Sequence, residues 1–215
     1  MKKKILSLAL VVALIAIMVG GSLAYFTAED EVTNTFTIGS VKIQIEEIFD
    51  DPETMIPVVQ KNENDPNYVN KDAFVTNTGA NDAYVQMFVA IPAALDKAGA
   101  FIVVDDNLND WTARVNVGTA TFTEDPGVTY NVYKYVYNKK LAPTESTSNV
   151  ITAAYLAPEL DYDHESGKYT MDGVTISDYT PGKTISIYVA AQAIQAEGFD
   201  SIDSALSNFG THPWA

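Results

Sequence analysis

The sequence predicts an all-β protein, an antiparallel β-sandwich of jelly-roll-like type with one or two short helices. Most of the chain alternates apolar and polar residues with a period of two, which is typical of half-buried strands. Clusters of turn-forming residues separate these stretches, and only two short segments have a helical pattern. Because the chain contains no cysteine, its fold must be stabilised by packing without disulfides.

The first strand of the domain is predicted at Val41, Ile43 and Ile45, which alternate with polar residues. Residues 50–72 are polar and contain spaced prolines. They predict a long loop, with a short strand around residues 56–59.

Two apolar stretches, 73–77 and 83–91, flank the turn-rich residues 78–82. This arrangement favours a hairpin. Residues 92–100 follow as a short predicted helix.

Residues 131–138 form a tyrosine-rich strand pattern. Its alternation places Tyr133, Tyr135 and Tyr137 on one face and Val132 and Val136 on the other. A stripe of this kind on a strand is most often cross-strand packing.

The last third of the chain contains a hairpin, a long strand and a helix. Asp172-Gly173 favours a type I′ turn between residues 169–171 and 174–176. Residues 184–194 alternate as a strand. The helix is predicted from its apolar spacing at Ile202, Ala205, Leu206 and Phe209, with Ser201 or Asp200 as the N-cap and Gly210 at its end.

The N-terminus has the pattern of a secretory signal peptide. Three lysines, Lys2 to Lys4, precede an apolar run from Ile5 to Val19. Small residues at Ser22 and Ala24 fit the signal peptidase, so we expect cleavage between Ala24 and Tyr25. The alternative is an uncleaved anchor, but the run is shorter than the ~20 residues that a spanning helix needs.

Three regions are therefore expected: a signal peptide at 1–24, an N-terminal segment at 25–40 and a β-sandwich domain at 41–215. Removing 24 of the 215 residues leaves 10 basic and 28 acidic side chains, a net charge of −18. Such a charge disfavours nucleic acid and anionic lipid as partners, because phosphate binding needs clustered lysine and arginine. The mature chain is expected to be secreted, with no membrane contact after cleavage.

The sequence provides few groups for catalysis. The two histidines, His164 and His212, are far apart and lack the His-Glu-x-x-His spacing of a zinc site. A Ser-His-Asp triad stays open, although the chain has no Gly-x-Ser-x-Gly elbow. We therefore expect neither an enzyme nor a cofactor. Calcium is the more reasonable metal because three oxygen-rich clusters occur, but Asp and Asn in loops are usually turn formers. These clusters are 62–65, Asp105 to Asn107 with Asp110, and Asp161, Asp163 and Glu165.

Four ordered blocks suggest a family. They are residues 24–27 with 34–41, residues 71–79 with 83–85, residues 135–138 with 141–143 and 146–147, and residues 193–200. Together they resemble the TasA/camelysin family of exported Gram-positive proteins, which are cut by a dedicated signal peptidase.

The resemblance implies a jelly-roll-like sandwich that acts as a structural subunit of biofilm matrix or cell-surface fibres. It also implies head-to-tail self-assembly, in which the freed N-terminal strand of one subunit fills a groove in the next. The strand expected to do this is residues 25–36, with Tyr25, Phe26, Val32 and Phe36 as anchors. The acidic residues 29–31 interrupt it and favour two shorter apolar patches. The alternative is that residues 25–36 complete the sheet of their own domain.

Two other functions stay open. Some members of the resembled family are labelled metallopeptidases, so a secreted camelysin-like metallopeptidase is one alternative. The other is a surface adhesion or ligand-binding module that uses the tyrosine face at residues 133–137. The expected partners are a second copy of the chain, the signal peptidase during export and other matrix proteins.

Overall fold

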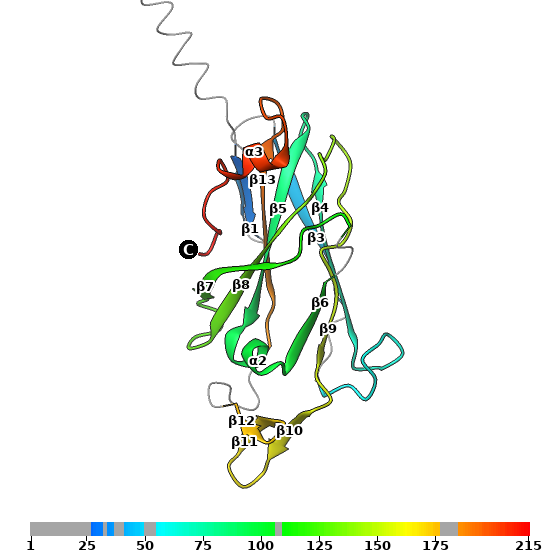
Figure 1. The fold of residues 1–215 in the computed structure, drawn as a ribbon, viewed down its shortest axis with the longest axis vertical. Coiled ribbons are helices and arrows are strands. Elements are labelled where there is room, and N and C mark those ends of the chain that lie inside the picture. The colour runs from blue at the N-terminus through cyan, green and yellow to red at the C-terminus, as the bar shows by residue number, and fades with distance from the viewer. Residues whose placement is uncertain (1–26, 32–33, 37–40, 50–54, 106–108, 177–184) are drawn as a thin grey trace, which may run out of the picture.

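The computed structural model is an antiparallel β-sandwich, as the sequence predicts (Figure 1). It describes residues 27–31, 34–36, 41–49, 55–105, 109–176 and 185–215. A six-stranded sheet packs against a four-stranded sheet, and a small three-stranded sheet lies at one end of the molecule. All ten strand pairs of the described residues are antiparallel.

The six-stranded sheet contains the first and the last strand of the described chain, with the strand order β2-β1-β13-β5-β8-β7. Its strands are β1 (Thr27–Glu31), β2 (Asn34–Phe36), β5 (Ala83–Pro92), β7 (Val115–Thr121), β8 (Thr129–Val136) and β13 (Tyr188–Gln195). The four-stranded sheet has the order β3-β4-β9-β6. Its strands are β3 (Ile43–Phe49), β4 (Val69–Asn77), β6 (Phe101–Asp105) and β9 (Ile151–Leu156).

The three-stranded sheet consists of β10 (Leu160–Asp163), β11 (Lys168–Met171) and β12 (Val174–Thr175). The predicted turn between β11 and β12 is confirmed, because Asp172 and Gly173 both have positive φ, 50° and 78°. These values are typical of the type I′ turn that matches the twist of a hairpin.

Two short helices complete the described elements. Helix α2 (Ala93–Ala98) ends at Gly99, whose φ of 70° would strain any side chain with a Cβ. Helix α3 (Ile202–Leu206) begins at the predicted N-cap Ser201, which forms a reciprocal capping box with Ser204. It ends at Ser207, before the predicted stop at Gly210, and Ala205 is its buried residue.

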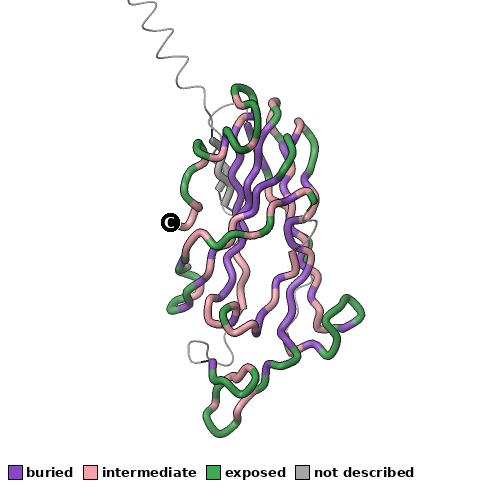
Figure 2. The backbone as a smooth tube through the Cα atoms, in the orientation of Figure 1, coloured by how far each residue is buried: buried purple, intermediate pink, exposed green. Residues whose placement is uncertain are grey.

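The main core lies between the two large sheets. Alternate residues of β5, including Val85, Met87 and Val89, face this core together with Ile43 and Trp111. The intervening residues of β5 are also buried, so this strand is covered on both faces. Figure 2 shows the buried residues concentrated along the central strands and the exposed residues in the loops.

The predicted hairpin of residues 73–77 and 83–91 is wrong. Strands β4 and β5 form there, but they belong to different sheets. The Asn77 Nδ2 atom donates to the backbone oxygens of Asn81 and Leu141, at 2.9 Å each, and so fixes the crossing from one sheet to the other. Two strands with a short turn between them have the same residue pattern in both arrangements.

Candidate functional site

Most of the sequence-predicted assembly residues lie outside the described residues. These are Ala24 and Tyr25 at the expected cleavage site, with Phe26 and Val32. Phe36 is the last residue of β2, and its Cα partner is Glu29 of β1. The predicted N-terminal segment therefore contributes two described strands.

The N-terminal strand β1 pairs with the C-terminal strand β13 of the same chain. Five Cα pairs connect them, from Thr27 opposite Ile194 to Glu31 opposite Ala190. Figure 1 shows β1, in blue, beside β13, in orange, at the edge region of the six-stranded sheet. The sequence left open whether residues 25–36 pair with their own domain, and in this single chain β1 does so.

Strand β13 is the part of the site that the sequence analysis did not single out. Its residues Val189, Ala191 and Ala193 face the main core, while Ala190 and Ile194 are buried on the other face. The side chains of β13 are thus covered on both faces, and β1 pairs with the backbone edge of this strand. The uninterrupted small apolar residues from Val189 to Ala191 indicate a strand that is covered on both faces, but they do not indicate that this strand receives β1.

A buried glutamine pair fixes β13 against its other neighbour. The Gln86 Nε2 atom of β5 donates to Gln192 Oε1 of β13 at 2.6 Å. Gln192 Nε2 then donates to the backbone oxygen of Thr211 at 2.8 Å. This chain of hydrogen bonds ties the C-terminal segment, residues 196–215, to the strand that receives β1.

The C-terminal segment covers the outer face of the six-stranded sheet. Ala205 packs with Tyr84 and Ile194. Further along, the Trp214 ring lies edge-on to Phe122, with centroids 5.4 Å apart, and Phe122 stacks on Tyr188. The face of β13 that points away from the main core is therefore closed by the segment that follows it.

Tyr188, at the start of β13, is anchored by an acid. Its hydroxyl donates to Asp125 Oδ2 at 3.0 Å, and the Tyr130 hydroxyl donates to the same oxygen. Burial, together with the hydrogen bond to Asp125, raises the pKa of Tyr188 to about 12, so the hydroxyl stays a donor at neutral pH. This contact fixes the end of β13 that β1 does not reach.

The tyrosine stripe of β8 faces the interior. Tyr135 and Tyr137 are buried in the main core, and Tyr133 packs against it. The Tyr135 hydroxyl donates to Asp105 at 2.7 Å, and burial raises the pKa of Tyr135. The stripe therefore takes part in cross-strand and inter-sheet packing and is not a free binding face.

Two of the three predicted oxygen-rich clusters, 62–65 and Asp161 to Glu165, act as turn formers. In the third, Asp106 and Asn107 lie outside the described residues, while Asp105 accepts from the Tyr135 hydroxyl and Asp110 pairs with Lys139. Asp65 accepts hydrogen bonds from the backbone N–H groups of Val59, Gln60 and Asn67. The bond from Gln60, followed by that from Asn67, lowers the pKa of Asp65 below its usual value. Asp163 similarly accepts from the Glu165 N–H. Both acids organise their own loops.

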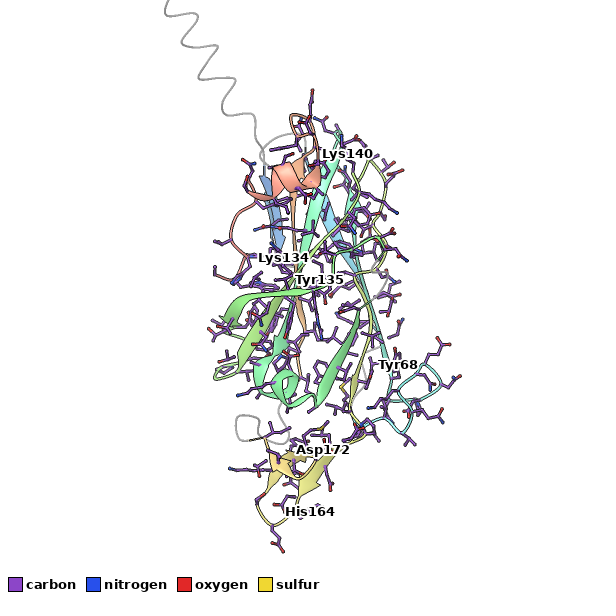
Figure 3. All side chains as sticks on the ribbon, viewed as in Figure 1. Tyr68, Lys134, Tyr135, Lys140, His164 and Asp172 are labelled. Carbon is purple, nitrogen blue, oxygen red and sulfur yellow. The ribbon has the colours of Figure 1, made fainter. Side chains whose placement is uncertain are left out.

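Nothing in the described part of the chain gathers three or more His, Cys, Asp or Glu side chains in a way that could hold a metal ion. The two histidines lie in separate places. His164 is in the β10–β11 hairpin at the end of the molecule formed by the three-stranded sheet (Figure 3), where its ring meets Tyr162. His212 packs beside Phe88 of β5, with ring centroids 6.4 Å apart.

Within the described ranges, no helix has both the length and the apolar character that crossing a membrane requires.

A sequence model of the camelysin metallo-endopeptidase family matches residues 1–166 of the chain. The match includes β1 to β10 and ends before β11, so the receiving strand β13 lies beyond it. Neither a curated protein nor a solved structure matches the chain. Because the matched residues make up well over half of the sequence, the chain belongs to the camelysin metallo-endopeptidase family, the TasA/camelysin family that its residue blocks resemble.

Proposed function

We propose that this protein is an exported structural subunit of extracellular matrix or cell-surface fibres, which joins its neighbours by exchanging the N-terminal strand. The observation that supports this most directly is the pairing of β1 with β13. The strand that completes this part of the sheet begins only three residues after the expected cleavage position at Ala24. A terminal strand is the part of a sheet that another copy can replace most readily, because it is connected to its domain on one side only.

Exchange would preserve the interactions of β1. The same five Cα pairs between β1 and β13 form whether the two strands come from one chain or from two. The free energy of the pairs themselves is therefore nearly unchanged, and protein concentration favours assembly. Because each subunit donates at one place and receives at another, the contact does not close on itself and extends into a filament.

The strand β1 has a composition suited to reversible pairing. Its sequence, Thr27-Ala-Glu-Asp-Glu31, contains three acids and no large apolar residue. Its release therefore loses chiefly backbone hydrogen bonds, each worth about 0.5–1.5 kcal/mol net. By contrast, β5 is buried along its entire length and cannot leave without opening the core.

Export would control when the strand is available. Cleavage after Ala24 by the signal peptidase would free the N-terminus next to β1, so this enzyme is the partner expected before assembly. Other matrix proteins with an unpaired sheet edge are further candidate partners. The net charge of −18 expected for the mature chain keeps single subunits soluble until they assemble.

Filament formation tests this function. We expect the mature chain, residues 25–215, to form filaments at raised concentration, and a variant lacking residues 25–36 to form none. Negative-stain electron microscopy and sedimentation measure this difference. Glu29→Pro should also abolish filaments because proline removes a ladder N–H in β1, whereas Glu29→Ala retains the donor and should assemble. Wild-type protein that stays monomeric at every concentration would refute the fibre function.

The family name supports one rival function, a secreted metallopeptidase. Casein digestion with and without a chelator distinguishes it from the fibre subunit. We expect no chelator-sensitive cleavage and no difference between the wild type and His164→Ala. Cleavage that disappears both with the chelator and in His164→Ala would establish the peptidase instead.

A further inference from the structure

Two tyrosines from distant parts of the chain stack on one another at the outer face of the four-stranded sheet. The rings of Tyr68 and Tyr155 have centroids 5.3 Å apart and an interplanar angle of 23°. Tyr155 belongs to β9, where its neighbours Ala154 and Leu156 face the main core, so its own side chain points to the outer face. Figure 3 shows Tyr68 beside the loop that precedes β4.

Backbone hydrogen bonds bring this loop and β9 together. The Tyr68 N–H donates to the backbone oxygen of Asp65 at 3.0 Å, within the turn that the Asp65 carboxylate organises. Earlier in the loop, the Val58 N–H donates to the backbone oxygen of Leu156 at 3.0 Å. Because Leu156 directly follows Tyr155, the loop is attached to β9 next to the stacked pair.

The hydroxyl groups of this pair are not used by the fold. Among the described residues, neither the Tyr68 hydroxyl nor the Tyr155 hydroxyl has a hydrogen-bond partner. The hydroxyls of Tyr130, Tyr135 and Tyr188, by contrast, each donate to an aspartate. Phenylalanine would stack equally well at both positions of the pair, so ring packing alone does not account for two phenols there.

The two rings differ in how far they are accessible. Tyr68 is half-buried, whereas only 9% of Tyr155 is exposed. A one-electron oxidant therefore reaches Tyr68 first. Because the rings are in contact, Tyr155 can return a hydrogen atom to the Tyr68 radical, and a second oxidation of Tyr68 then leaves a radical on both rings.

We propose that Tyr68 and Tyr155 form an oxidative modification site, at which hydrogen peroxide, acting through a peroxidase, couples the two rings into dityrosine. Each phenol loses one electron and one proton, and the two radicals pair into a bond between a Cε atom of each ring. The hydrogens on these carbons move to the oxygens, which restores both aromatic rings. The pair loses two hydrogen atoms, and one peroxide is reduced to two waters. This cross-link is independent of strand exchange.

The stacked geometry favours this bond, because the π orbitals of two phenoxyl radicals overlap when the rings lie face to face. A second tyrosine pair provides the contrast. The centroids of Tyr130 and Tyr188 are also 5.3 Å apart, but the rings are inclined at 82°. Both of these hydroxyls donate to Asp125, which fixes the rings in the edge-on position. We therefore expect coupling in the stacked pair and none in the edge-on pair.

The cross-link would stabilise a chain that contains no cysteine. Tyr68 and Tyr155 are 87 residues apart in the sequence, so their coupling closes a long loop in the unfolded chain. Closing such a loop lowers the entropy of the unfolded state, as a disulfide does in the chain-entropy model. Oxidation would then make the folded subunit more resistant to unfolding.

Oxidation of the dilute mature chain, residues 25–215, by a haem peroxidase with hydrogen peroxide tests the proposal. We expect the blue fluorescence of dityrosine in monomers isolated by size exclusion. Trypsin, which cleaves after lysine, places the two tyrosines on peptides 62–71 and 141–168. Mass spectrometry should find these peptides joined, at a mass two hydrogen atoms below their sum. Fragmentation assigns the bond to Tyr155, because Tyr162 lies on the second peptide as well.

The test variants are Tyr68→Phe and Tyr155→Phe, each of which retains the ring and removes the hydroxyl that oxidation requires. Both should lose the fluorescence of the oxidised monomer. Tyr188→Phe is the matched control, because it removes a hydroxyl from the edge-on pair and should retain the fluorescence. Circular dichroism before oxidation verifies that each variant folds.

Urea unfolding measures the effect of the cross-link on the monomer. We expect oxidation to shift the midpoint of the wild type to a higher urea concentration and to leave the midpoint of Tyr68→Phe without this increase. Oxidised wild type without dityrosine, or with dityrosine only between copies, would overturn the proposal. Fluorescence that persists in the Tyr68→Phe monomer would overturn the assignment to this pair. Equal midpoints for untreated and cross-linked wild type would overturn the stabilising effect.

Discussion

Trp111→Ala is expected to reduce the free energy of unfolding by about 3–5 kcal/mol, the range for removing a fully buried large aromatic side chain. Trp111 is completely buried in the main core, and its ring packs on Tyr137 with centroids 5.0 Å apart. The Nε1–H group donates to the backbone oxygen of Ser148 at 3.1 Å. Alanine would leave both a cavity and an unpaired carbonyl, and urea unfolding followed by circular dichroism measures the loss.

Two further variants separate these contributions. Trp111→Phe retains an apolar ring and loses only the Nε1 donor with part of the volume, so its cost should be clearly smaller. Val174→Ala is the surface control, because this side chain is 70% exposed and should change stability by less than about 0.5 kcal/mol. A Trp111→Ala protein as stable as the control would contradict the packing described for the core.

Gln192→Leu is expected to cost about 2–4 kcal/mol, because it removes a polar side chain that satisfies two buried groups. Its Oε1 accepts from Gln86 Nε2, and its Nε2 donates to the Thr211 carbonyl. Leucine fills a similar volume but leaves both of these groups without that partner. Urea unfolding measures the cost, and limited proteolysis should show faster cleavage within residues 196–215.

A double-mutant cycle makes this prediction specific. Gln86→Leu with Gln192→Leu removes both members of the pair, so it should be less destabilising than the sum of the single variants. Gln195→Leu is the control, since the Gln195 side chain hydrogen-bonds Glu197 at an exposed position. If the loss of unfolding free energy in the double variant equals the sum of the losses in the two single variants, the glutamines do not stabilise the fold as a pair.

The alternating pattern of the sequence predicted where the strands lie better than it predicted which strands pair with one another. Val41 and Ile43 are buried and Lys42 and Gln44 are exposed, as period two requires. The same pattern did not reveal that β4 and β5 lie in different sheets, because each strand has an apolar face in either arrangement. Sheet membership follows from the pairing of distant strands, and the crossing between the sheets includes a contact from Asn77 to Leu141, 64 residues along the chain.

Only one of the two strands of the candidate site, the N-terminal strand, was predicted as functional from the sequence. The N-terminal segment was identified from the cleavage pattern and the family resemblance, whereas β13 gave no functional signal of its own. Its residues, Val189 to Ala191, have the composition of any strand that is covered on both faces. Whether a strand has a free edge that can receive another strand depends on which strands pair beside it. This pairing is determined by the folded sheet and cannot be read from the residues of the strand alone.

The pairing of β1 with β13 has a consequence for the order of folding. The two strands are separated by more than 150 residues, so their contact has one of the highest sequence separations in the protein. Contacts of this kind form late, because the chain must lose much of its entropy before they can be made. In the export proposed above, a chain that emerges N-terminus first would expose β1 well before β13 has left the translocation channel. The first strand to appear outside the cell would then be without its own partner for the longest time, and in the proposed assembly the edge of a completed subunit nearby would offer it the same pairing.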